Sequence, residues 1–168
     1  VDMKGRKSHA IVNNALTILN NLLHRGACGC EENTGDGVGI LIQKPHKFFK
    51  RICEDINIIL PDVDDYGTGM VFLPVDESQS NYCQEIFKKI VLEENQKFLG
   101  WRNVPTNDDL LGPTAKEGEP TFKQIFIGKN ENIDSSAFDR KLYIIRKRVE
   151  NHIWNSDISE QNLFYVPS

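Results

Sequence analysis

The sequence lacks the features that mark membrane and secreted proteins. No apolar run approaches the roughly 18 residues that a membrane-spanning helix needs. The opening VDMKGRKSHA has no apolar signal-peptide core, and no Asn-x-Ser/Thr glycosylation acceptor occurs. Four cysteines in 168 residues are too few for a disulfide scaffold. We therefore expect a reducing, intracellular setting and no membrane partner.

The charge balance also excludes a class of partner. The net charge is −4, which disfavours general nucleic-acid binding, and the basic RKLYIIRKR (140–148) is more typical of a solvated helix face. The hydrophobic content of 39% and charged content of 26% suit an ordinary globular core. The length predicts one domain over residues 1–168.

Apolar spacing predicts an alternation of helices and strands. We expect helices over about 8–24, from Pro45 onward with Phe48, Phe49 and Ile52 inward, from about 76–78 to 91, and over 138–153. We expect strands over 38–42, 68–74, 97–105, 121–128 and, barely begun, 163–167, with a loop over 109–120. Strands that are apolar on both faces need cover on both sides, so the pattern indicates a layered α/β or α+β sandwich.

The stretch HRGACGCEENTGDGVGI (24–40) is rich in glycine and could serve as a phosphate cradle, a metal clip or a pocket wall. Dinucleotide-binding loops need G-x-G-x-x-G between a strand and a helix. Here Gly35, Gly37 and Gly39 are spaced by two and follow a helix, and no Gly-Lys-Ser/Thr occurs. Both the spacing and the context argue against a phosphate site.

The cysteines of this stretch invite two other interpretations. Cys28 and Cys30 form a C-x-C pair near His24, whereas zinc sites usually use C-x2-C pairs with a second pair elsewhere. Small buried thiols are the simpler interpretation. A thiol-dependent amidohydrolase that uses Cys28 or Cys30, with His24 as its base, remains an alternative.

Several segments together resemble a known family. GRKSHAIVNNALTILNNLLHRGACGCEENTGDGVGILIQKPHKFF is similar to the start of the class II glutamine amidotransferase (glutaminase) domain of glutamate synthase large subunits. The resemblance continues, in the family's order, through DYGTGMVFLP, QKFLGWRNVP, LGPTAKEGEP, QIFIG and KLYIIRKRVEN. Within the family, the loop is more similar to NAD(P)H-linked than to ferredoxin-linked enzymes.

The resemblance implies a fold and a reaction. The fold is α+β, a four-layer αββα sandwich of the N-terminal-nucleophile hydrolase type. The domain would hydrolyse glutamine to glutamate and ammonia, and the ammonia would reach another domain of the same polypeptide for reductive amination of 2-oxoglutarate. That domain uses FMN and an iron–sulfur cluster, with NAD(P)H supplied through a small subunit or a fused reductase domain. Such enzymes occur in the cytoplasm or in plastids and other organelles.

The resemblance also implies that catalytic groups are missing here. The family nucleophile is a cysteine at the mature N-terminus, where this sequence has Val1, and none of the four cysteines matches it. The arginine for the substrate carboxylate and the Asn-Gly oxyanion donors belong to a segment beyond LFYVPS. We expect a sequence incomplete at both ends, inactive alone and prone to self-association. A non-catalytic binding or assembly module of the same fold is the other alternative.

Only near-pocket residues carry over from the family. His24, Arg25 and Gly26 match its His-Arg-Gly turn, which lies beside the nucleophile. Arg25 could act electrostatically on the thiolate, or brace the loop through carbonyl oxygens, and both roles stay open. Asp36 is expected to hold the turn, with Gly35, Gly37 and Gly39 supplying positive φ angles and close backbone approach. No cofactor-binding or metal-binding residue is expected in this chain.

Overall fold

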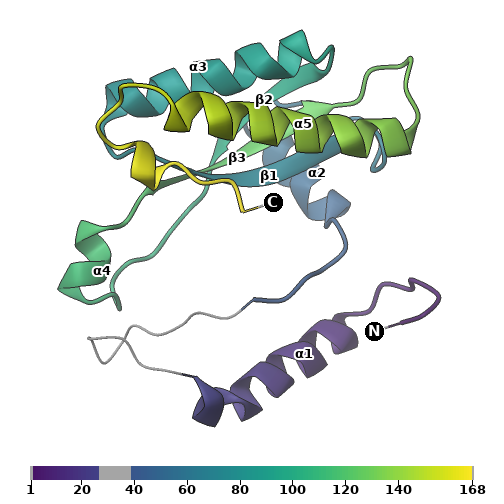
Figure 1. The fold of residues 1–168 in the computed structure, drawn as a ribbon. Coiled ribbons are helices and arrows are strands. Elements are labelled where there is room, and N and C mark those ends of the chain that lie inside the picture. The colour runs from purple at the N-terminus through teal and green to yellow at the C-terminus, as the bar shows by residue number, and fades with distance from the viewer. Residues whose placement is uncertain (1, 27–38, 168) are drawn as a thin grey trace. The chain divides into compact units, whose positions relative to one another are not determined.

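A computed structural model describes residues 2–26 and 39–167. The chain divides into two compact units, residues 1–45 with 107–118, and residues 46–106 with 119–168. Figure 1 shows the elements of both units. Each unit is described by itself below.

The first unit is built on one long helix. Helix α1 runs over His9–Asn21 and is followed by a short 3₁₀ turn, Leu23–Arg25. This confirms the helix expected over 8–24. Ser8 has extended backbone at the N-cap position, but its side chain makes no capping hydrogen bond. No residue of α1 is buried.

Two expectations for the first unit were wrong. Residues 39–42 form no strand, although their apolar run predicted one for 38–42. A strand needs a ladder partner, and none of the described strands pairs with this segment. The expected loop over 109–120 contains helix α4, Pro113–Glu117. Pro113 begins this helix, a position that requires no backbone N–H and matches the fixed φ of proline.

The second unit contains a three-stranded antiparallel sheet in the order β1-β3-β2. The strands are β1 (Tyr66–Leu73), β2 (Lys97–Asn103) and β3 (Thr121–Gly128). The register of β2 against β3 shifts between Phe98 and Gly100, where Gly100 has a φ of +152°. The expected strand at 163–167 is reduced to a single bridge, in which Tyr165 exchanges backbone hydrogen bonds with Phe72 of β1.

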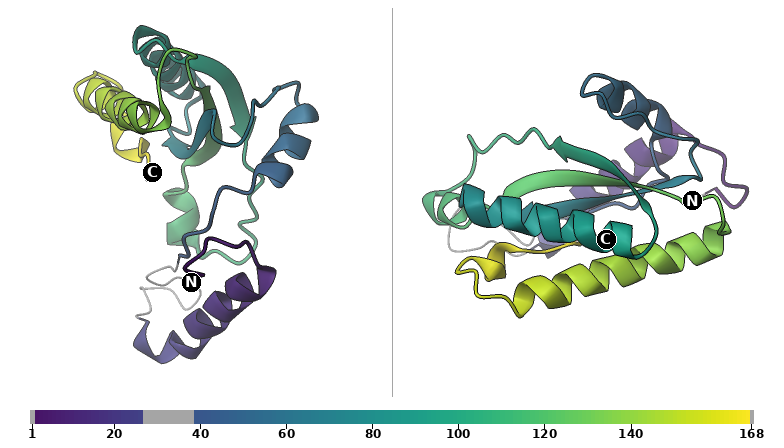
Figure 2. Two further views of the ribbon diagram at one scale, coloured as in Figure 1. Left: turned by 90° about the vertical axis from the view of Figure 1, so that its right-hand side faces the viewer. Right: turned by 90° about the horizontal axis from the view of Figure 1, so that it is seen from above.

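Helices cover both faces of the sheet in the second unit (Figure 2). Helices α3 (Glu77–Glu93) and α5 (Ser135–Trp154) lie on one face, and the shorter α2 (His46–Glu54) lies on the other. Asp76 and Asp134 cap α3 and α5, accepting backbone N–H bonds of 2.9 Å from Gln79 and 2.7 Å from Ala137. The carboxylates accept hydrogen bonds from N–H groups that would otherwise be unpaired. Their negative charge also interacts favourably with the positive N-terminal ends of the helix dipoles.

Two apolar clusters hold this unit together. The larger lies between the sheet and helices α3 and α5, and it includes Val71, Phe87, Ile125, Ile145 and Val149. The smaller joins α2 to the other face and consists of Phe49, Cys53, Ile58, Leu60, Tyr66 and Phe126. The expectation that Phe48 also points inward was wrong, since its side chain is 43% exposed. Neighbouring helix residues differ by about 100° in direction, so Phe48 and Phe49 cannot both face the sheet squarely.

The fold is therefore α+β, as expected. No described helix combines the length and apolarity needed to cross a membrane.

Candidate functional site

The His24–Arg25–Gly26 turn closes the C-terminal end of α1. The Leu22 N–H donates to both Ile18 O and Leu19 O at 3.1 Å, and the Arg25 N–H donates to Leu22 O at 2.8 Å. These bonds tighten the last helical turn and satisfy carbonyl groups that a helix end leaves without partners.

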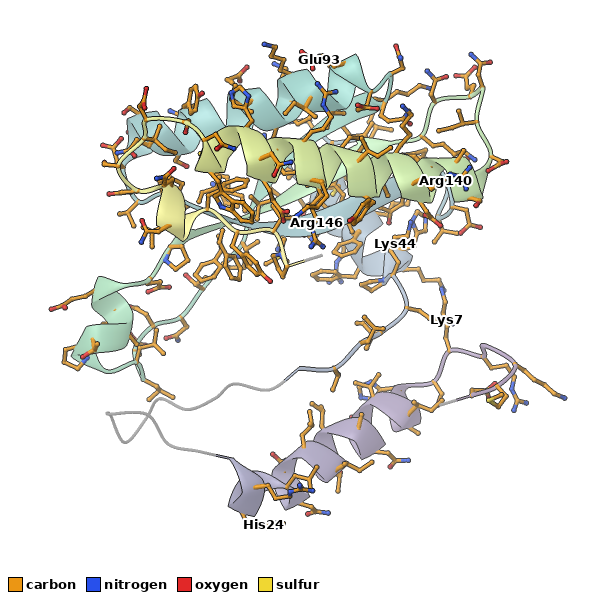
Figure 3. All side chains as sticks on the ribbon, in the orientation of Figure 1. Lys7, His24, Lys44, Glu93, Arg140 and Arg146 are labelled. Atoms are coloured by element: carbon orange, nitrogen blue, oxygen red, sulfur yellow. The ribbon has the colours of Figure 1, made fainter. Side chains whose placement is uncertain are left out.

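The side chains of this turn are available for contacts. His24, labelled in Figure 3, has its Nδ1 atom 3.1 Å from Asn21 O, which orients the ring against the helix end. His24, Arg25 and Gly26 are all exposed. The turn therefore presents a guanidinium and an imidazole at one end of α1, at the start of the glycine-rich stretch 24–40.

The remaining predicted site residues are only partly testable. Asp36, together with Gly35, Gly37, Cys28 and Cys30, lies outside the described residues. Gly39 is described, and the positive φ expected for it was wrong, since its φ is not in the left-handed region. A Cβ atom there would meet no atom of residues 2–26 or 39–167 within 4 Å. The expected close backbone approach in this stretch stays a prediction.

Cys53 and Cys83 are buried free thiols. Burial raises the pKa of Cys53, an effect that nearby Arg102 partly opposes, and burial raises the pKa of Cys83 to about 11. Because the thiolate is the nucleophilic form, both side chains are unreactive near neutral pH. They serve as small apolar groups in the two cores.

A histidine–tyrosine pair lies where α2 meets β1. His46 Nδ1 is 3.1 Å from the Tyr66 hydroxyl, and the ring centroids are 5.7 Å apart. Tyr66 is 1% exposed, and burial, with a smaller contribution from Cys53, raises its pKa to about 12. Spacing along the sequence could not reveal this pair, because the two residues are 20 positions apart.

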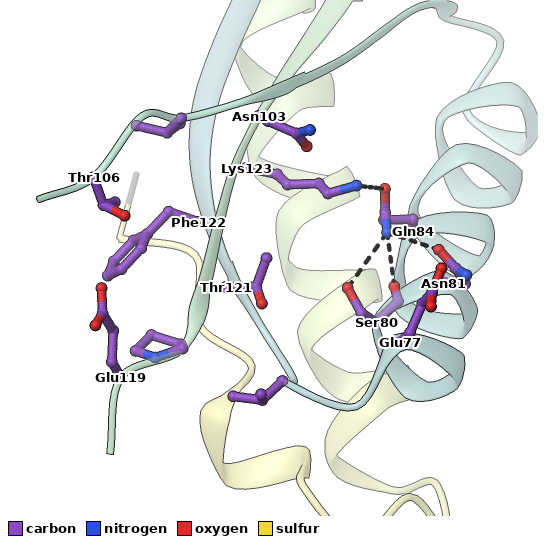
Figure 4. A pocket seen from close by; sticks show the side chains of 13 residues that line it. Glu77, Ser80, Asn81, Gln84, Asn103, Thr106, Glu119, Thr121, Phe122 and Lys123 are labelled. Carbon is purple, nitrogen blue, oxygen red and sulfur yellow. Dashed lines mark hydrogen bonds between the residues drawn. The ribbon is translucent and has the colours of Figure 1, made fainter. Parts of the chain in front are cut away.

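A pocket of about 480 Å³, lined by both polar and apolar residues, lies at one end of the sheet in the second unit and is shown in Figure 4. Its walls come from the first half of α3, the end of β2 and the start of β3. Lys123 Nζ donates to Gln84 Oε1 at 2.9 Å across this pocket. No motif pointed to these residues. The pairing depends on β3 lying beside α3, which local spacing does not reveal.

Metal ligands do not gather in the described part of the chain. No group of three or more His, Cys, Asp or Glu side chains in residues 2–26 and 39–167 is arranged to hold a metal ion.

Comparison with known proteins identifies the class. The family model described as glutamine amidotransferases class-II matches residues 1–168, and the chain belongs to this family. Its relatives include the glutamate synthase [NADPH] large chain of Bacillus subtilis, 41% identical over 167 residues, which cover 99% of this chain and 11% of the relative.

Two further relatives carry other electron donors in their names. The NADH glutamate synthase of Saccharomyces cerevisiae is 36% identical over 98% of this chain and 8% of its own length. The ferredoxin-dependent glutamate synthase 2 of Synechocystis is 35% identical over 86% of this chain and 9% of its own length. The chain thus resembles a glutamine amidotransferase segment of glutamate synthases and spans about a tenth of the length of these relatives.

Proposed function

We propose that this chain is the glutaminase part of a glutamate synthase. It would bind glutamine and release ammonia for the reductive amination of 2-oxoglutarate in other domains of the same polypeptide. The observation that carries the proposal is the match to glutamate synthases across the chain, 99% of it for the Bacillus subtilis relative. The reaction places the chain in glutamate biosynthesis and ammonia assimilation.

The His24–Arg25–Gly26 turn forms part of the glutamine pocket in this proposal. The exposed Arg25 lies on a turn fixed by backbone hydrogen bonds, so its guanidinium is carried on a defined support. A guanidinium near a cysteine thiolate stabilises the charged form and lowers the pKa of the thiol. Asp36, which lies outside the described residues, is a further near-pocket candidate that the family resemblance implies.

In this proposal the nucleophile is an N-terminal cysteine of the family type, and none of the four cysteines of this sequence takes that role. Cys53 and Cys83 are buried with raised thiol pKa values. We therefore propose that the 168-residue chain alone does not hydrolyse glutamine. We also propose that the domain adopts the four-layer αββα arrangement implied by the family resemblance, with the sheet and helices α3 and α5 of the second unit as two adjacent layers.

We further propose that the parent enzyme uses FMN and an iron–sulfur cluster, as the resemblance to glutamate synthases implies. We propose NAD(P)H rather than ferredoxin as the electron donor. The 41% identity to the NADPH-linked relative, against 35% to the ferredoxin-dependent one, supports this choice.

The role of Arg25 can be tested in a chimera that replaces the matching segment of the Bacillus subtilis large chain with residues 1–168. Loss of a hydrogen bond to a charged group costs about 1.5–3 kcal/mol. Arg25→Met should therefore lower kcat/KM for glutamine by roughly 10-fold to 100-fold. Arg51→Met, at an exposed position on α2, is the matched control and should leave kcat/KM unchanged.

A second readout separates chemistry from bracing. A thiolate-stabilising Arg25 also controls the pKa of the nucleophile, so Arg25→Met should shift the acidic limb of the pH–rate profile upward. A bracing Arg25 would change the melting temperature and leave the profile in place. Unchanged kcat/KM and an unchanged profile would remove Arg25 from the proposed site.

A further inference from the structure

The pocket of the second unit has one rigid wall. Gln84 is 8% exposed, and its amide nitrogen donates to Ser80 O at 3.1 Å and to Asn81 Oδ1 at 3.3 Å. Its amide oxygen accepts from Lys123 Nζ at 2.9 Å. Figure 4 shows these bonds converging on Gln84. With both ends of the amide engaged, Gln84 holds the Lys123 ammonium in a fixed place at the pocket.

The charge of Lys123 is not neutralised there. An ammonium group has three donors, and the neutral Gln84 oxygen takes one of them without cancelling the charge. Within the described residues, Lys123 forms no ion pair at 4.0 Å or less. Lys123 is also half-buried, which reduces the water available to solvate its charge. The pocket therefore carries a cation suited to an anionic group of a ligand.

Two carboxylates face the same pocket. Glu77 comes from the first turn of α3, and Glu119 comes from the segment just before β3. In the view of Figure 4 they lie on opposite sides of the pocket. Neither forms an ion pair within the part of the chain that the structure describes. Three charged groups thus surround one pocket without pairing with one another.

We propose that this pocket binds a small diamino acid, with one carboxylate and two cationic nitrogens. Lys123 would hold the carboxylate, while Glu77 and Glu119 would each face one cationic nitrogen. Such a ligand carries a net charge opposite to that of the three side chains. The volume of about 480 Å³ lies in the usual range for small-molecule sites, roughly 300–1,000 Å³. The inference goes beyond the glutaminase proposal, since the ligand undergoes no reaction.

Ligand discrimination tests the proposal on the unmodified chain. L-lysine, L-norleucine and L-glutamate are titrated into the ¹⁵N-labelled chain, with the amides of Asn103, Thr121 and Gln84 as reporters. L-norleucine has the length of lysine without the side-chain ammonium. Losing one charged contact should weaken binding about tenfold or more. The chemical shifts should therefore saturate at a much lower concentration of L-lysine than of L-norleucine or L-glutamate. Equal shifts from all three, or no saturable shift at roughly 50 mM L-lysine, would overturn the proposal.

Variants then assign the contacts. Lys123→Met should weaken L-lysine binding about tenfold or more, and Lys123→Arg should retain most of it. Lys50→Met, at an exposed position on α2, is the control and should bind L-lysine as the unmodified chain does. Undiminished binding in Lys123→Met would refute the assignment. If Lys123→Met also changes the conformation of Gln84, the comparison of the three ligands on the unmodified chain remains a valid test. Neither measurement uses glutamine hydrolysis, so failure here leaves the glutaminase proposal unaffected.

Discussion

Arg148 Nη1, on α5, donates a hydrogen bond of 2.6 Å to Oε1 of Glu94, the C-cap residue of α3. Lys141, also on α5, reaches the other oxygen of the same carboxylate at 2.6 Å. The Glu94 side chain is 13% exposed, so this pair of contacts is better shielded than an ordinary surface ion pair. One carboxylate therefore ties the two helices that cover the same face of the sheet.

The first prediction concerns stability and pH. The hydrogen bond from Lys141, then that from Arg148, holds the pKa of Glu94 below its ordinary value. A lowered folded-state pKa stabilises the fold above the unfolded pKa, and that contribution disappears as pH falls through the folded pKa. Glu94→Gln should lower the free energy of unfolding by about 1–3 kcal/mol at pH 7.

Denaturant unfolding at several pH values checks this prediction. The difference between Glu94→Gln and the unmodified chain should shrink once the pH falls below about 4.5, the ordinary glutamate value. Glu85→Gln, whose side chain is 73% exposed, is the control and should change stability little. If the difference in the free energy of unfolding stayed constant as the pH fell well below the ordinary glutamate value, the assigned role of Glu94 would be contradicted.

The second prediction concerns the buried thiols. In a Cys28→Ser/Cys30→Ser background, Cys53 and Cys83 should resist alkylation at pH 8. A thiol pKa of about 11 for Cys83 leaves on the order of 0.1% thiolate at that pH. Mass spectrometry after iodoacetamide treatment should show modification only when denaturant is added. Rapid labelling of the folded chain would mean that these thiols are accessible.

The third prediction concerns the irregular pairing of β2. Gly100 has a φ of +152°, and a Cβ atom there would lie 2.7 Å from Ile58 Cδ1. Gly100→Ala should therefore cost about 1–3 kcal/mol of stability through backbone strain and overpacking. Gly118→Ala is the control, since its nearest neighbours would lie at 3.8 and 3.9 Å and its φ is −98°. Equal melting temperatures for the two variants would contradict this account.

Sequence reasoning recovered the second unit better than the first. Strand β3 has the expected bounds, and α5 matches the spacing of Phe138, Ile145 and Ile153, which are all buried. Those patterns succeeded because each element buries a single regular stripe or run against its neighbours. The strand prediction for residues 39–42 failed because an apolar run does not show whether a neighbouring strand is available to pair with it.

The site followed the same division. The helix expected over 8–24 put His24, Arg25 and Gly26 at its end, where the structure has them. Their place beside a nucleophile, which the family motif implies, stays a prediction. The pairs His46–Tyr66 and Gln84–Lys123 depend on contacts across 20 and 39 positions, so spacing along the chain could not reveal them. Asp36 lies outside the described residues, and its place near the turn stays a prediction.

The central proposal is that this chain supplies the glutaminase part of a glutamate synthase. The most direct test measures glutamine hydrolysis by the isolated 168-residue chain and by the Bacillus subtilis chimera. Glutamate synthesis from added ammonia serves as the folding control for the chimera, because it bypasses glutamine hydrolysis. The proposal predicts hydrolysis by the chimera and none by the isolated chain. It would be contradicted by a chimera that uses ammonia but not glutamine, or by activity of the isolated chain that Cys28→Ser abolishes.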